Sequence, residues 1–447
     1  MSHKDTGVVN QEVNAKSAAQ VKDQMERDIL AAIKKPKPVY WLGLLITITM
    51  TLIGAAAWAY QIKTGMGVAG IRNPVGWGVY ITDFVFWVGI AHSGTLISAI
   101  LFLFRARFRN RFNRSAEAMT VFAVMTAGLF PLIHLGRVWF FYWLFPYPTQ
   151  RLLWVNFRSP LVWDVFAVST YFTVSAIFWY IGLVPDIAIL RRVRTGWQKL
   201  AYAFGSLGWK GTFKQWQHYN QIYKYLAALA TPLVLSVHSV VSWDFAMGII
   251  PGWHTTIFAP YFVAGAIFSG MAMVFTLVIP MRKFFRLEKY ITVDDFEKAA
   301  KLLLFTGMIV GYAYIVEFCL AMYSGNPFER DQFIYRAVGD YAFTYWLMIA
   351  CNVVTPLTLF VRKLRRNIKY LFIISFFVNI GMWLERFNIV VISLAHDFDP
   401  YAWGTYTPSI IEVAITVGSF GWFLTWFLLF SKTLPVLPIT ELKEEAE

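Results

Sequence analysis

Long apolar runs alternate with short polar segments along the whole chain. Each run has about 20 residues or more, the length that crosses the hydrocarbon core of a bilayer as a helix. Ten runs are present: Val39–Tyr60, Val79–Phe104, Ala116–Leu144, Leu161–Leu190, Tyr219–Met247, Ile257–Phe284, Ala299–Tyr323, Ala337–Val361, Ile368–Ala395 and Ser409–Ser431. The pattern predicts an all-α, polytopic membrane protein with about ten transmembrane helices.

Lys and Arg are distributed very unevenly between the polar segments. The segments on the side of the N-terminus carry 31 of them, and the loops on the opposite side carry six. Because basic residues are retained in the cytoplasm, both termini, with residues 1–38 and 432–447, are predicted to be cytoplasmic. This location also explains the net charge of +14, and it indicates membrane lipid rather than nucleic acid as the partner of the basic residues.

Composition supports the membrane assignment and excludes two kinds of redox site. Hydrophobic residues make up 57% and charged residues 15% of the chain, whereas soluble proteins carry about 25% charged residues. Residues 1–38 contain no apolar core, so no cleavable signal peptide is expected. The two cysteines, Cys319 and Cys351, are too few for a four-thiolate iron–sulfur cluster and form no C-x-x-C-H haem-attachment motif.

Two similar stretches, GIAHSG at Gly89–Gly94 and GAIFSG at Gly265–Gly270, indicate an internal repeat. Each is followed by an apolar run and a basic loop, and both lie in helices that run from outside to inside. The pattern predicts parallel repeats over residues 79–247 and 257–395, flanked by single helices at 39–60 and 409–431. Close packing of two helices would also account for these Gly and Ser residues.

His134 and Asp164, in the outer half of consecutive helices, are the main candidates for chemistry. A charged side chain at a helix centre costs about 2.5–3.5 kcal/mol on insertion scales, so its presence calls for a function. Arg137 is expected on the same helical face as His134, at i, i+3, and Pro131 predicts a local break beside them. Oxidation of a quinol needs a proton acceptor near each ring oxygen, which a His and a carboxylate supply. The structural alternative is a satisfied buried His and an Asp that caps its helix.

Other ionisable residues inside the apolar runs could relay protons, with structural hydrogen bonding as the alternative. The candidates for a proton path are Asp83, His92, His238, Asp244, Glu317, Glu385 and Arg386. Asp83 and His92 are nine residues apart on one helix and should face opposite sides. Asp244 could simply reach the interface, and the neighbours Glu385 and Arg386 could pair with each other. Asp186, near the cytoplasmic boundary, is expected to snorkel to water.

Three motifs resemble the NrfD/polysulfide-reductase type of quinol-interacting membrane subunit. They are ITDFVFWVGIAHSGTLISAI at residues 81–100, PLIHLGRVW at 131–139 and SPLVWDVFAVSTYF at 159–172. Within that family the chain is most similar to the C subunit of alternative complex III. The resemblance covers essentially all ten predicted spans.

The resemblance implies two four-helix bundles with one peripheral helix at each side. It implies that menaquinol or ubiquinol is oxidised near the outer face, with His134 and Asp164 matching the quinol-site residues, and that this chain itself binds no haem or iron–sulfur cluster. Electrons would pass to an extra-cytoplasmic iron–sulfur subunit and onward to haem c subunits and a terminal oxidase. The complex would contain a second NrfD-like subunit and lie in the bacterial inner membrane. Coupling to proton translocation is left open.

Two other functions remain compatible with the sequence. A b-type cytochrome would use pairs of His92, His134 and His238 as haem ligands across helices, although each helix carries one His, at a depth expected to differ from the others. A secondary transporter would also combine repeats with charges at the membrane midplane. Few helices, however, are broken by Gly or Pro at matched positions of the two halves.

Overall fold

The structure is a computed structural model that describes residues 20–33, 36–145 and 157–445. Residues 1–19 of the predicted cytoplasmic N-terminal segment lie outside this range. In the described residues, ten helices are long and apolar enough to cross a membrane and no β-strand occurs, which confirms the all-α polytopic fold. The spanning helices are α2 (Pro38–Thr64), α3 (Val79–Thr95) continued by η2 (Leu96–Ile100) and α4 (Leu101–Leu103), α5 (Asn113–Ala127) with α6 (Leu129–His134), α7 (Pro160–Val193), α9 (Phe213–Ala246), α10 (Phe258–Phe284), α11 (Val293–Tyr323), α13 (Ala342–Ile349) continued by η5 (Ala350–Val354), α14 (Thr355–Leu357) and η6 (Thr358–Phe360), α16 (Ile368–Phe387) with η7 (Asn388–Ile392) and α17 (Ser393–Ala395), and α18 (Ile410–Thr433).

Shorter helices lie outside these spans. They are a helix over residues 20–32, η1 (Met66–Val68), η3 (Arg107–Arg111), η4 (Val138–Leu144), α8 (Gly196–Gly205), α12 (Pro327–Val338), α15 (Arg362–Arg365), η8 (Pro400–Ala402) and α19 (Ile439–Glu445).

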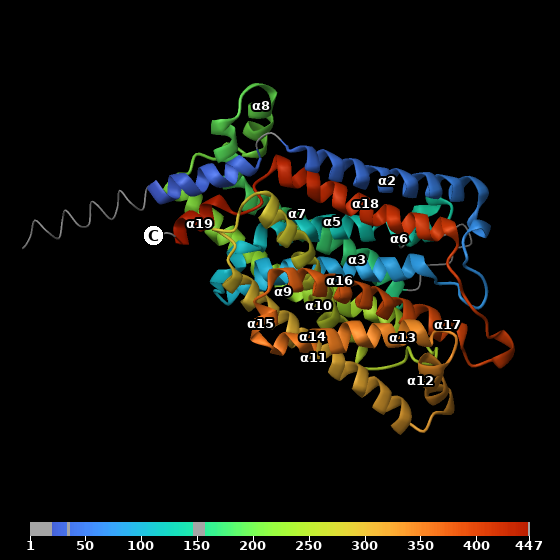
Figure 1. The fold of residues 1–447 in the computed structure, drawn as a ribbon. Coiled ribbons are helices and arrows are strands. Elements are labelled where there is room, and N and C mark those ends of the chain that lie inside the picture. Colours follow the sequence, from blue (N-terminus) through green and yellow to red (C-terminus); the bar gives the residue numbers. More distant parts are fainter. Residues whose placement is uncertain (1–19, 34–35, 146–156, 446–447) are drawn as a thin grey trace, which may run out of the picture.

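The spanning helices form two four-helix bundles and a peripheral pair (Figure 1). The first bundle consists of α3, α5–α6, α7 and α9, and the second of α10, α11, α13–α14 and α16. The bundles meet along α3 and α10, where small residues let the two backbones approach closely. Gly270 leaves the space that Ser93 fills, because a Cβ atom at position 270 would lie 2.1 Å from the Ser93 hydroxyl oxygen.

Equivalent residues of the predicted repeat meet at the start of α3 and α10. Gly76-Trp77 precedes α3 and Gly252-Trp253 precedes α10 at a spacing of 176 residues, which is also the spacing between the GIAHSG and GAIFSG stretches. The rings of Trp77 and Trp253 stack with their centroids 5.6 Å apart. The similarity between the two halves therefore extends beyond the six-residue match, and its tryptophans form part of the contact between the bundles.

The two peripheral helices lie against each other, so the expected arrangement with one at each side is wrong. α2 and α18 run side by side along one flank of the bundles (Figure 1). Gly54, Gly418 and Gly421 line their contact, and a Cβ atom on Gly54 would lie 2.6 Å from the Gly418 Cα. Because these glycines have no side chains, the two helix backbones can come into direct contact.

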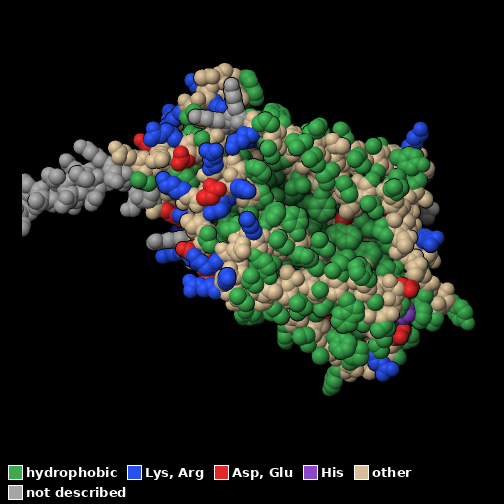
Figure 2. Space-filling model, in the orientation of Figure 1, with side chains coloured by type: hydrophobic (Ala, Val, Ile, Leu, Met, Phe, Trp, Pro, Cys, Tyr) green, Lys and Arg blue, Asp and Glu red, His purple; other side chains and the backbone are tan. Residues whose placement is uncertain are grey.

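Basic side chains gather at one end of the molecule, and a broad apolar surface covers its length (Figure 2). α19 lies at the basic end, and an ion pair between Arg109 and Glu441 holds it there (Figure 1). By the distribution of Lys and Arg, this end is the one predicted to face the cytoplasm.

Asp186 is completely buried at this end, so the expectation that it snorkels to water is wrong. It pairs with Arg114 at 3.1 Å and accepts hydrogen bonds from the backbone N–H and the hydroxyl of Thr440. Arg114 also pairs with Glu117 at 3.1 Å. Because α19 brings Thr440 over the end of α7, Asp186 has partners that its position along α7 does not reveal.

Candidate functional site

The third spanning helix is interrupted close to His134. α5 ends at Ala127, Gly128 forms a turn, and α6 then runs for six residues and ends at His134. Pro131 has no N–H to donate to the carbonyl of Ala127, which accounts for the break that this proline predicted. His134 is therefore the last helical residue before the chain turns towards the outer surface.

Arg137 lies outside this helix, so the expected i, i+3 relationship with His134 is wrong. Gly136 adopts a left-handed conformation with φ of 75°, and it turns the chain out of the helical path. Arg137 has extended backbone angles as the residue before η4, and its side chain is exposed.

The imidazole of His134 keeps an open hydrogen-bonding position. Its Nδ1 atom is buried and has no partner within the described ranges. The end of α6 is fixed from α2, because the Gln61 amide donates a hydrogen bond to the carbonyl of Ile133 at 3.0 Å. The Tyr80 hydroxyl donates in turn to the side-chain oxygen of Gln61, which is fully buried. These contacts orient the backbone beside His134 and leave its ring nitrogen free.

Asp164 of α7 faces a second carboxyl group, that of Asp244 of α9. The two side chains lie within hydrogen-bonding range of each other. In each, the Oδ1 atom is buried and has no partner in the part of the chain that the structure describes. A hydrogen bond between two carboxyl groups requires that one of them carries a proton. The pair is therefore a candidate site for holding a proton.

Tryptophans pack beside the carboxyl pair. Trp163 and Trp243 directly precede the two aspartates, and their rings meet edge to face with centroids 5.9 Å apart. The N-cap of α7 is Ser159, so Asp164 does not cap its helix, and that alternative is wrong. The Trp-Asp dipeptide that occurs in both helices is the sequence signal that could have linked Asp244 with Asp164.

His134 and Asp164 are not bonded to each other directly. No hydrogen bond or ion pair joins them in residues 20–33, 36–145 and 157–445, and each retains an unpartnered buried atom. Both belong to the first bundle, one at the outer end of α6 and the other near the outer start of α7. The structure therefore leaves both groups open to a ligand.

His92 and His238 form a second buried group inside the first bundle. The His92 ring stacks on Tyr171 and its centroid lies 4.8 Å from that of His238. The expectation that these histidines differ in depth is therefore wrong. Their rings are in direct contact, which leaves no room for a porphyrin between them. Both ring nitrogens of His238 lack partners among the described residues.

Asp83 lies on a different side of α3 from His92, as the nine-residue spacing predicted. Its Oδ1 accepts a hydrogen bond from the Trp383 indole at 2.7 Å, and its Oδ2 accepts one from the Thr416 hydroxyl at 2.6 Å. Both oxygens are thus partnered, and the side chain connects α3 with α16 and α18.

A cluster of charged residues is buried in the second bundle. Glu385 and Arg386 pair with each other, and the Tyr314 hydroxyl donates a hydrogen bond to Glu385. Glu317 pairs with Arg336 at 3.8 Å. Arg336 belongs to α12, outside the spanning helices, so a search of the apolar runs missed it. Glu317 Oε1 has no hydrogen-bond partner among the described residues.

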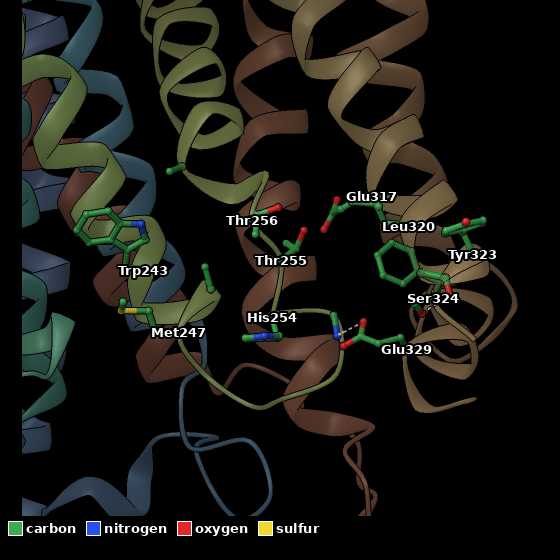
Figure 3. Close-up of a pocket in the computed structure, with 15 residues that line it drawn as sticks. Trp243, Met247, His254, Thr255, Thr256, Glu317, Leu320, Tyr323, Ser324 and Glu329 are labelled. Atoms are coloured by element: carbon green, nitrogen blue, oxygen red, sulfur yellow. Dashed lines mark hydrogen bonds between the residues drawn. The ribbon is translucent and has the colours of Figure 1, made fainter. Parts of the chain in front are cut away.

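A cavity of about 530 Å³ opens next to this cluster. Figure 3 shows the Glu317 carboxylate directed into it, towards the loop that carries Thr255. On another wall Glu329 of α12 accepts a hydrogen bond from the Gly252 N–H at 2.9 Å, and burial raises the pKa of Glu329. Trp243 lines the cavity from α9, so the cavity lies next to the helix that carries Asp244.

Comparison with known proteins identifies a family and several related oxidoreductase subunits. Residues 67–396 match the family described as polysulphide reductase, NrfD. The chain is 27% identical over 405 residues to a proposed membrane subunit of dimethyl sulfoxide reductase from Halobacterium salinarum, with 85% of this chain and 87% of the relative covered. It is 24% identical over 419 residues to a subunit of selenate reductase from Mesobacillus selenatarsenatis (89% and 93% covered). It is 20% identical over 430 residues to the Hdr-like menaquinol oxidoreductase integral membrane subunit of Archaeoglobus fulgidus (91% and 96% covered).

Proposed function

The chain belongs to the NrfD family of membrane subunits, and we propose that it binds and oxidises quinol within a respiratory oxidoreductase complex. One observation carries the proposal. Three buried atoms at the outer end of the first bundle, His134 Nδ1, Asp164 Oδ1 and Asp244 Oδ1, lack partners in the described ranges. Leaving buried polar atoms without partners costs free energy, so these atoms are best explained as contacts for a ligand.

A quinol headgroup suits these three atoms. Its two hydroxyl groups are donors, and a carboxylate oxygen or a neutral imidazole nitrogen accepts from a hydroxyl. Oxidation to the quinone releases two electrons and two protons. One proton passes to the Asp164–Asp244 pair and the other to His134, each acting as a general base. The rings of Trp163 and Trp243 offer apolar surface beside the carboxyl pair.

The electrons leave to another subunit in this proposal. Cys319 and Cys351 are too few for a four-thiolate cluster, and the proposed quinol site lies at the outer end of the bundle. An extra-cytoplasmic iron–sulfur subunit would accept the two electrons there. The relatives named as subunits of two reductases and of an oxidoreductase support a role in such a complex.

We further propose that the complex is of the alternative complex III type, in a bacterial inner membrane. It would then contain a second NrfD-like subunit and haem c subunits, and it would pass electrons to a terminal oxidase. The motifs at residues 81–100, 131–139 and 159–172 support this assignment. The substrate is menaquinol or ubiquinol.

We propose that quinol oxidation is coupled to proton movement through the buried groups of both bundles. The groups on this route are His92, His238, Asp244, Glu317, Glu385 and Arg386. Glu317 borders the outer cavity, so the cavity would be the exit to the outer water. Asp83, with both oxygens partnered by Trp383 and Thr416, would anchor helices beside this route.

The quinol site is tested in the purified complex with His134→Ala and Asp164→Asn. We expect each variant to assemble with all its partners and to lose quinol oxidation by about 10²-fold or more, the typical contribution of a general base. Electron transfer from an artificial donor to the iron–sulfur subunit should be unchanged in the same preparations. Wild-type rates of quinol oxidation in both variants would contradict the assignment of this site.

Three observations on the wild-type protein separate this function from its alternatives. Affinity purification of the chain should bring down an iron–sulfur subunit and a haem c subunit. A Soret band in the chain separated from those partners would instead support a b-type cytochrome. Substrate uptake by the chain alone in vesicles would support a transporter.

A further inference from the structure

The short helix α8 carries a row of large apolar side chains on its outer surface. Trp197 is 77% exposed, Leu200 is 74% exposed and Phe204 is 85% exposed. At about 100° per residue these three positions fall within roughly 60° of one another on the helix. Leu207, just beyond the helix, is also exposed. Such a continuous apolar face on a soluble surface would be costly, which indicates that something covers it.

α8 is held firmly against the bundle, so its exposed face is part of the fold. The Tyr202 hydroxyl donates a hydrogen bond to the carbonyl of Thr433 at 2.8 Å. The Tyr180 hydroxyl donates to the carbonyl of Gly205 at 2.8 Å. Arg191 donates to the Ser206 hydroxyl at 3.0 Å, which fixes the turn after the helix. These contacts orient α8 along one side and leave the apolar row outside.

The same contacts set the depth of α8 relative to the membrane. Thr433 is the last residue of α18, and Tyr180 lies about 20 residues into α7, close to the span of a hydrocarbon core. α8 therefore lies at the cytoplasmic boundary, at the basic end of the molecule (Figure 1). With ten residues it is too short to cross a membrane.

Basic residues accompany the apolar row. Lys199 lies outside the apolar row, roughly 100–160° around α8 from its three residues. Lys210 and Lys214 follow the helix and Arg192 precedes it, and all four basic side chains are exposed. Tyr202, which contacts the bundle, lies on the side of α8 that faces away from the apolar row. An amphipathic helix that rests on a bilayer has this arrangement, with its apolar side towards the acyl chains.

We propose that α8 is an interfacial anchor that inserts Trp197, Leu200 and Phe204 into the cytoplasmic leaflet and binds anionic lipid headgroups through its flanking basic residues. Charge complementarity identifies the occupant, because the cytoplasmic leaflet carries anionic lipids and attracts clusters of Lys and Arg. The anchor acts on the lipid at this end of the protein and is independent of the quinol site.

The test places an environment-sensitive fluorophore on Leu200→Cys in the full chain. Cys319, which is exposed, is first replaced by Ser, and the protein is reconstituted in nanodiscs of phosphatidylcholine with or without phosphatidylglycerol. We expect a blue-shifted emission and a several-fold slower reaction with a water-soluble quencher when phosphatidylglycerol is present. The matched label at Lys199→Cys, which lies outside the apolar row, should remain accessible to the quencher.

The basic residues are tested in the same label background with Lys210→Gln and Lys214→Gln together. In this variant the emission and quenching of the Leu200 label should be the same with and without phosphatidylglycerol. The proposal would be overturned if the Leu200 label reacted with the quencher as fast as a water-exposed label in both kinds of nanodisc. Protection that does not depend on anionic lipid, or that occurs only when other subunits of the complex are present, would overturn it as well.

Discussion

The carboxyl groups of Asp164 and Asp244 face each other across the first bundle, 80 positions apart in the chain. Each aspartate follows a tryptophan, and the two tryptophans pack edge to face. The proposed quinol site therefore has two neighbouring carboxyl groups in place of a single aspartate. His134, at the end of α6, supplies a separate acceptor.

The first prediction concerns this pair. Asp244→Asn should lower quinol oxidation by about 10²-fold, as much as Asp164→Asn, because either change disrupts the carboxyl pair that accepts one proton. The double variant should be little worse than either single variant. Steady-state quinol oxidation by the assembled complex provides the measurement.

Asp340→Asn is the matched control for the carboxyl pair. Asp340 follows Asp164 by the 176 residues that also separate Trp77 from Trp253, but it is exposed and accepts a hydrogen bond from Tyr335. Its replacement should leave quinol oxidation unchanged. Normal activity of Asp244→Asn would show that Asp164 acts without its neighbour.

The second prediction concerns the contact that holds the end of α6. Gln61→Leu removes the hydrogen bond to the Ile133 carbonyl and leaves the buried Tyr80 hydroxyl without its acceptor. Unpartnered buried polar groups cost about 1–3 kcal/mol, so the thermal unfolding midpoint in detergent should fall. Because His134 follows Ile133, quinol oxidation should fall as well. A loss of stability with full activity per folded molecule would show that the Gln61 hydrogen bond does not position His134.

The third prediction concerns the contact between the peripheral helices. Gly54→Ala would place its Cβ atom 2.6 Å from the Gly418 Cα, so α2 and α18 must move apart, at a cost of about 1–3 kcal/mol. Gly43→Ala, on the same helix, would meet only a Leu428 side-chain atom at 3.8 Å and should be neutral. Thermal unfolding of the two variants is measured in parallel, and equal midpoints would contradict the prediction.

The fourth prediction concerns the buried ion network at the cytoplasmic end. Arg114→Met leaves the buried carboxylates of Glu117 and Asp186 without their shared partner, so stability should fall by about 3–5 kcal/mol. Lys443→Met breaks a partly exposed pair with Glu26 and should cost at most about 1 kcal/mol. Thermal unfolding in detergent measures both, and a similar loss for the two variants would be evidence against a structural role for Arg114.

Several features followed from the sequence because each depends on a local property of the chain. The length of the apolar runs predicted ten spanning helices, and the structure has ten in the described residues. Pro131 predicted the break before His134, because a missing N–H acts on its own helix. The opposite directions of Asp83 and His92 followed from helical geometry alone.

Only the tertiary structure decided the features that depend on contacts between distant segments. The approach of α2 to α18 needs glycines on both helices, and the burial of Asp186 needs Thr440 from α19. Asp244 meets Asp164 because α7 and α9 are neighbours in the first bundle. Hydropathy predicts which segments cross the membrane, but it does not indicate which helices are adjacent. The sequence by itself therefore determined the spans and predicted the orientation and His134 and Asp164 as candidates, whereas the packing of the bundles determined the partners of these groups.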